Sequence, residues 1–67
     1  MIELTINGKV LQLKNPINLM NFLEDNSIEP RMIVIEYNGE IIKPEYWNNT
    51  TLKSGDKLEI VHMVAGG

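Results

Sequence analysis

Residues 33–42 read IVIEYNGEII, and this stretch decides the fold. The apolar, β-branched run from Met32 to Tyr37 is typical of a central strand in a sheet. Asn38-Gly39 supplies the two positive φ angles of a type I′ turn, so Glu40 to Ile42 should return as an antiparallel strand. The stretch therefore predicts a β-hairpin in which a buried strand is followed by a short one.

The same signal occurs at the start of the chain. Ile2 to Ile6 alternate between apolar and polar residues, which is the period of a half-buried strand. Asn7-Gly8 follows, and Lys9 to Leu13 should return antiparallel with Leu11 and Leu13 on the face of Ile6. A first β-hairpin is expected here.

One helix is predicted between the two hairpins. Asn18 stands as an N-cap after Asn15-Pro16, and Asp25-Asn26-Ser27 ends the segment. The residues that form the apolar face of the helix are Leu19, Met20, Phe22 and Leu23. We expect this face to cover the sheet.

The remainder of the chain contains one more clear strand. Tyr46 and Trp47 fall in a loop or a single helical turn, where both rings should pin the segment to the core. Ser54-Gly55-Asp56 is a turn signal, and the alternation that follows predicts a strand from Lys57 to Val64. The fold class is α+β, with a mixed sheet of about five strands on one main helix. Residues 1–64 form the domain and 65–67 a flexible tail.

Composition limits the classes of function. The chain has 67 residues, a formal charge of −3, no cysteine and no cluster of Lys and Arg. The missing basic patch argues against nucleic acid as a partner. No apolar run approaches the roughly 20 residues that cross a bilayer, and the start resembles no signal peptide, so a cytoplasmic protein without membrane contact is expected.

The residue inventory predicts neither a catalytic nor a metal site. A cysteine nucleophile is absent. The one histidine, His62, lies within the last predicted strand on the same face as Leu58 and Ile60, which predicts a partly buried, hydrogen-bonded side chain. Zinc would lack its usual ligands. We therefore expect a protein that is not an enzyme.

The unusual feature is the end of the chain, Gly66-Gly67. At a background glycine frequency of about 7%, a terminal pair arises by chance in about 0.5% of chains. Two residues without Cβ make a narrow tail that can enter another protein's active site. The carboxylate of Gly67, ionised at neutral pH, is a nucleophile toward phosphorus but a poor electrophile, so a partner must activate it.

The chain resembles the ThiS-type sulfur carriers of thiamine biosynthesis, which have the ubiquitin-like β-grasp fold. The resemblance covers nearly the whole length. Its most specific parts are residues 33–42 and the stretch 52–67, LKSGDKLEIVHMVAGG. One departure is Ala65, where many members of that family have a third glycine.

The resemblance implies a mechanism and a set of partners. An E1-like, ThiF-type enzyme would use ATP to adenylate Gly67, and a sulfur donor such as a cysteine desulfurase would supply the sulfur of a thiocarboxylate. A ThiG-type thiazole synthase would then accept the sulfur. The chain itself would bind no cofactor and would act as a co-substrate.

Two other readings share the same fold and the same ending. One is a MoaD-like carrier for molybdopterin synthesis, and the other is a protein modifier joined to lysines through Gly67. Fold alone does not separate these pathways. The short chain and the compact hairpin at Asn38-Gly39 favour the thiamine branch.

A carrier must be recognised by its partners, and alternation places three apolar residues on the sheet face opposite the helix. These predicted interface residues are Val34, Val61 and Met63. Negative charge that would steer the chain to a basic partner comes from Glu36, Glu40, Glu45 and Glu59.

Overall fold

The computed structural model of the chain describes residues 1–63. Its elements, in chain order, are β1 (Ile2–Ile6), β2 (Lys9–Leu13), β3 (Ile17–Asn18), α1 (Leu19–Asp25), the 3₁₀ turn η1 (Pro30–Met32), β4 (Ile33–Tyr37), β5 (Glu40–Ile42), the 3₁₀ helix η2 (Pro44–Asn49), β6 (Thr51–Leu52) and β7 (Lys57–His62).

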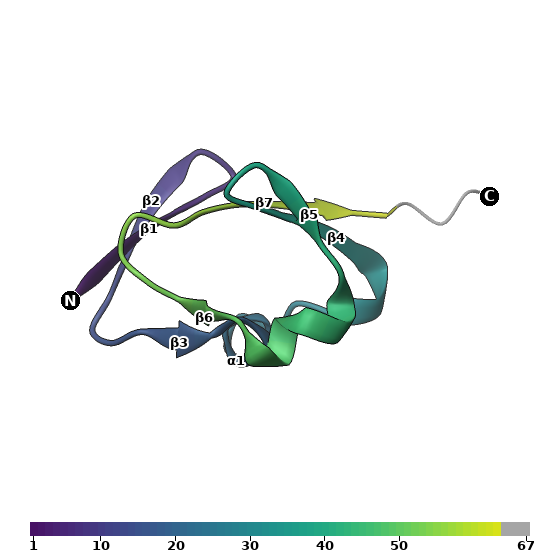
Figure 1. Cartoon of the computed structure of the whole chain (residues 1–67), viewed down its shortest axis with the longest axis horizontal. Coiled ribbons are helices and arrows are strands. Elements are labelled where there is room, and N and C mark those ends of the chain that lie inside the picture. The colour runs from purple at the N-terminus through teal and green to yellow at the C-terminus, as the bar shows by residue number, and fades with distance from the viewer. Residues whose placement is uncertain (64–67) are drawn as a thin grey trace.

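A five-stranded sheet forms one layer of the fold. Its strand order is β2-β1-β7-β4-β5, with β7 parallel to β1 and antiparallel to β4. Figure 1 shows α1, η2 and the small β3–β6 sheet forming the opposite layer. This mixed sheet covered by one main helix is the predicted α+β, β-grasp arrangement.

Both Asn-Gly hairpins form as predicted. Asn7 and Gly8 have φ values of 49° and 82°, and Asn38 and Gly39 have 51° and 90°. These positive angles match the right-handed twist of the flanking strands. The resulting registers pair Ile6 with Lys9 and Tyr37 with Glu40.

The helix also begins where the sequence predicts. The Asn18 side-chain oxygen accepts a hydrogen bond from the backbone N–H of Asn21 at 3.2 Å, which caps the first turn. Leu19, Phe22 and Leu23 are buried against the sheet. With only seven residues, α1 depends on this packing for its stability.

The core lies between the two layers. Its buried apolar residues are Ile2, Leu4, Leu19, Phe22, Leu23, Ile33, Ile35, Trp47, Leu52, Leu58 and Ile60. Trp47 is 1% exposed, and its indole N–H donates to the carbonyl oxygen of Ile42 at 2.9 Å. The prediction that Trp47 pins its segment is confirmed, whereas Tyr46 is 54% exposed and does not do so.

Three details of the prediction are wrong. The strand predicted from Met32 begins at Ile33, because Met32 belongs to η1. The last strand ends at His62, and Val64 lies outside the described residues. His62 is exposed although it shares the parity of buried Ile60 and pairs with buried Ile33, because it lies beyond the part of β7 that pairs with β1 and has a strand on one side only.

Within residues 1–63, no helix is long and apolar enough to cross a membrane.

Candidate functional site

The strand that leads to the C-terminal residues lies in the middle of the sheet. β7 has β1 on one side and β4 on the other, and in Figure 1 it ends at the side of the molecule away from the N-terminus. The backbone N–H of Met63 still donates to the carbonyl oxygen of Met32 at 2.7 Å. The chain is therefore held by the sheet up to its last described residue. Ala65, Gly66 and Gly67 lie outside the described residues.

Both Asn-Gly turns help to hold β7. The Asn7 side chain donates to the carbonyl oxygen of Ile60 at 3.2 Å and accepts from the N–H of Ile60 at 2.6 Å. The Asn38 side-chain oxygen accepts from the N–H of Lys57 at 2.8 Å. These turn side chains add hydrogen bonds to β7 from both sides between Lys57 and Ile60.

A buried carboxylate anchors the start of β7. Asp56 is 4% exposed, and its oxygens accept from the Tyr37 hydroxyl at 2.6 Å, the backbone N–H of Lys53 at 2.9 Å and the Asn38 amide at 3.2 Å. The Lys53 ammonium lies 3.4 Å from the same carboxylate. The sequence indicated a turn at Asp56, but the burial of its charge depends on tertiary contacts with β4.

The electrostatics of this cluster favour the charged carboxylate. Burial raises the pKa of Asp56, but the hydrogen bonds from Tyr37, Lys53 and Asn38 outweigh burial and hold the pKa below its usual range. Burial and the bond to Asp56 raise the pKa of Tyr37. The hydroxyl of Tyr37 and the carboxylate of Asp56 raise the pKa of Lys53.

Replacing Asp56 with asparagine is expected to lower the free energy of unfolding at pH 7 by about 1–3 kcal/mol, because an amide cannot accept from all of these donors. The lowered pKa means that the folded state holds fewer protons than the unfolded state in acid. The carboxylate's contribution is therefore full at neutral pH and is lost as pH falls below about 4 toward the folded-state pKa.

Urea titrations of wild type and Asp56→Asn at pH 7 and in acid measure this difference. The difference in free energy of unfolding between the two proteins should shrink as pH falls, since protonation of Asp56 removes the charge that the variant lacks. A difference that stays constant across this range would show that the charge of Asp56 does not contribute to stability.

The predicted interface residues come together on the outward face, which is the side of the five-stranded sheet away from α1. Val34 and Val61 are direct cross-strand partners, and Met63 follows Val61 by two residues. Val61 is 56% exposed and Met63 48%, while Val34 is half-buried. The three residues lie beside the point where β7 ends.

Sequence reasoning missed one member of this surface. Ile41 is 68% exposed and pairs with Glu36, whose side chain shares the outward face with Val34. The hairpin signal at Asn38-Gly39 contained this information, because a two-residue turn sets Glu36 opposite Ile41. Val34, Ile41, Val61 and Met63 are called the apolar patch below.

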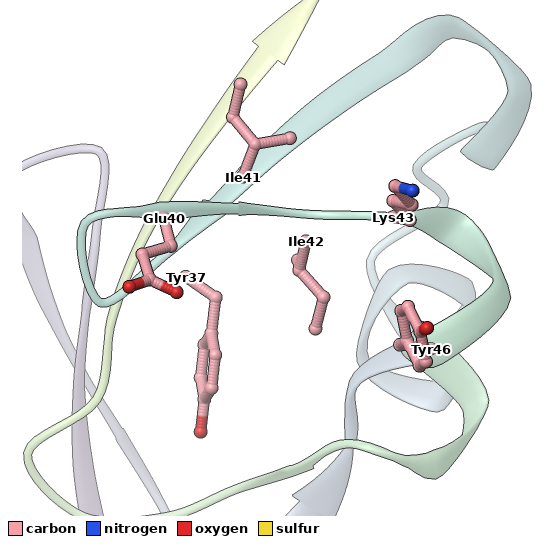
Figure 2. Close-up of a pocket in the computed structure, with 6 residues that line it drawn as sticks. All are labelled: Tyr37, Glu40, Ile41, Ile42, Lys43 and Tyr46. Atoms are coloured by element: carbon pink, nitrogen blue, oxygen red, sulfur yellow. The ribbon is translucent and has the colours of Figure 1, made fainter.

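A shallow hollow of about 310 Å³ lies at the β5 edge of the sheet. Its lining residues are Tyr37, Glu40, Ile41, Ile42, Lys43 and Tyr46. In Figure 2, Ile41 extends to one side of β5, whereas the rings of Tyr37 and Tyr46 lie on the other side with Ile42 between them. The lining offers neither a nucleophile with an adjacent base nor a phosphate-binding loop.

The part of the chain that the structure describes also contains no group of three side chains arranged to hold a metal ion. What the molecule presents is a rigid sheet, an exposed apolar patch and a central strand that leads to the last residues.

Comparison with known proteins agrees with this geometry. The ThiS family model matches residues 2–67, which is nearly the whole chain and includes Gly66 and Gly67. The chain belongs to the ThiS family. Family membership and the β-grasp fold thus agree with the resemblance seen in the sequence.

Individual relatives support the same family. The chain is 34% identical over 65 residues to the sulfur carrier protein ThiS of Bacillus subtilis, covering 96% of this chain and 98% of that protein. The crystal structure of the thiamine biosynthesis protein ThiS from Geobacter metallireducens superposes with a TM-score of 0.85 at 29% identity, covering 98% of this chain and 100% of the other.

A third relative differs in size. The chain is 29% identical over 66 residues to a thiazole synthase of Paramagnetospirillum magneticum, and the match covers 98% of this chain but 20% of that protein. A segment similar to this ThiS-family chain thus occurs within a much larger chain.

Proposed function

We propose that this ThiS-family chain is a sulfur carrier in thiamine biosynthesis and that the carboxylate of Gly67 is its working group. The observation that carries the proposal is the family match, which extends through Gly66 and Gly67. The position of β7 supports it, because this strand, which leads to the last residues, pairs with β4 up to His62 and is held on its other side up to Ile60 by β1 and Asn7.

The chemistry requires an activating partner. A carboxylate anion resists nucleophilic attack, so an E1-like, ThiF-type enzyme first joins it to the α-phosphorus of ATP and releases pyrophosphate. The acyl-adenylate has AMP as a good leaving group. The terminal sulfur of a persulfide, formed on a donor such as a cysteine desulfurase, attacks the carbonyl carbon and expels AMP. A thiol then reduces the resulting acyl disulfide, which leaves a thiocarboxylate on the carrier and a disulfide on the donor side. The carrier is a co-substrate in these steps and binds no cofactor of its own.

A ThiG-type thiazole synthase is the proposed acceptor of the sulfur. The Paramagnetospirillum magneticum relative supports this pairing, because a protein named thiazole synthase contains a segment similar to nearly all of this chain. Joining two proteins in one chain raises their effective concentration and is useful where they act together.

The names of the relatives favour thiamine over the molybdopterin alternative. Deleting the gene should produce a strain that needs thiazole for growth in medium without thiamine, and expression of the chain should remove that need. Growth without thiazole, or a defect corrected only by a molybdopterin product, would contradict the thiamine assignment. Covalent conjugates of high mass would instead indicate a protein modifier.

The apolar patch is the proposed docking surface for these partners. Val61→Asp is expected to slow sulfur transfer by at least about tenfold, since a charge at the centre of an interface opposes desolvation. The matched control is Val10→Asp, because Val10 is 63% exposed and pairs with Thr5 at the far edge of the same sheet. The rate of thiocarboxylate formation on the carrier measures the effect. Equal rates for the two variants would show that the apolar patch is not part of the interface.

A further inference from the structure

Two glutamates lie directly opposite one another on the outward face. Glu36 of β4 and Glu59 of β7 are cross-strand partners, and both are exposed. The Cβ atoms of such a pair are about 5 Å apart, and like charges at this position destabilise a sheet. Within residues 1–63, neither carboxylate takes part in an ion pair. The isolated chain therefore keeps an arrangement that costs it stability.

The surroundings of the pair are apolar on two sides. The next cross-strand pair on the same face is Val34 with Val61, and Ile41 is the β5 neighbour of Glu36. Lys57 precedes Glu59 by two residues on the same face but is not in an ion pair with either carboxylate. The two negative charges thus belong to the same surface as the apolar patch.

We propose that Glu36 and Glu59 together bind an arginine side chain of thiazole synthase when that enzyme docks on the outward face. The inference rests on the proposed function, because it specifies the chemistry by which the carrier's partner is recognised. The docked arginine neutralises both carboxylates and removes their repulsion.

Arginine fits this surface better than lysine does. The planar guanidinium has five N–H donors and can bind two carboxylates at once, whereas an ammonium is a compact and strongly hydrated charge. The aliphatic stem of an arginine also packs on apolar side chains such as Val34 and Ile41. Charge and shape together therefore indicate a basic residue set within an apolar surface of the partner.

The test uses Glu36→Gln, Glu59→Gln and the double variant, which keep the side-chain shape and remove charge. Binding of full-length carrier to thiazole synthase from the same organism is measured by calorimetry at two salt concentrations. The double variant should bind at least about tenfold more weakly and lose much of the wild type's salt dependence. Its unfolding midpoint should equal or exceed that of wild type, because the repulsion is gone.

The matched control is Glu24→Gln, because Glu24 is an exposed carboxylate on α1, in the other layer of the fold. It makes the same change in charge as each single variant and should leave affinity unchanged. Wild-type affinity and salt dependence in the double variant would overturn the proposal, and so would a lowered unfolding midpoint. Weakened binding to the adenylating enzyme alone would overturn the assignment to thiazole synthase.

The proposed function fails by a different observation, which is the absence of a thiocarboxylate on wild-type carrier. That assay does not involve the Glu36 and Glu59 variants, so the two failures are distinguishable.

Discussion

Deletion of Gly66 and Gly67 is expected to abolish sulfur transfer while leaving the fold intact. The proposed chemistry occurs at the carboxylate of Gly67, and the shortened chain would carry its terminal carboxylate two residues earlier, on Ala65. Every buried core residue of the described chain lies at or before Ile60, so the unfolding midpoint should not change measurably. Thiocarboxylate formation and thermal unfolding are measured on the same preparation.

A chain extended by one alanine after Gly67 is the companion variant. It keeps both glycines but moves the carboxylate by one residue, so it should also fail to gain sulfur. Transfer at the wild-type rate in either variant would show that the chemistry does not depend on the Gly67 carboxylate. Loss of folding in the deletion variant would show that the last residues stabilise the domain.

Trp47→Ala is expected to have the largest effect on stability. The ring is the largest fully buried side chain, and its indole N–H satisfies the carbonyl oxygen of Ile42. Truncation of a buried tryptophan costs about 3–5 kcal/mol. Since small domains have about 5–15 kcal/mol in total, the variant should be close to unfolding at 25 °C.

Tyr46→Ala is the matched control, because Tyr46 is the adjacent aromatic residue in η2 and is 54% exposed. It should cost less than about 1 kcal/mol. Urea titration followed by circular dichroism measures both variants without relying on tryptophan fluorescence. Similar losses for the two variants would contradict the assignment of Trp47 to the core and Tyr46 to the surface.

The parts of the fold that could be predicted are those with local signals. Asn7-Gly8 and Asn38-Gly39 fix their hairpins because few other residues adopt two consecutive positive φ angles. Asn18 marks the helix start through a contact only three residues long. Each of these features is decided within a few residues of sequence.

Features that depend on distant partners were not predicted. β3 and β6 have two residues each, too few to show any periodicity, and they form only because Ile17 pairs with Leu52. The alternation along β7 predicted that His62 is partly buried, but His62 lies beyond the residues of β7 that pair with β1, and that register joins residues far apart in the sequence. Alternation gives the face of a side chain and does not show what covers that face.

The candidate site likewise has features that the local sequence predicts and features that depend on contacts between distant residues. Alternation alone placed Val34 and Val61 on one face, and the structure shows that they are direct partners. The pairing of Glu36 with Glu59 required the register between β4 and β7, which joins residues far apart in sequence. The burial of Asp56 likewise follows from its contacts with Tyr37 and Asn38.

The most direct test of the central claim is the intact mass of the full chain after incubation with its adenylating enzyme, ATP and a sulfur source. The account predicts that the protein gains the mass difference between one sulfur and one oxygen atom, and that fragmentation places this gain on Gly67. Omission of ATP should abolish the gain. An unchanged mass with an active enzyme, or a gain located on another residue, would contradict the assignment of Gly67 as the residue that carries sulfur.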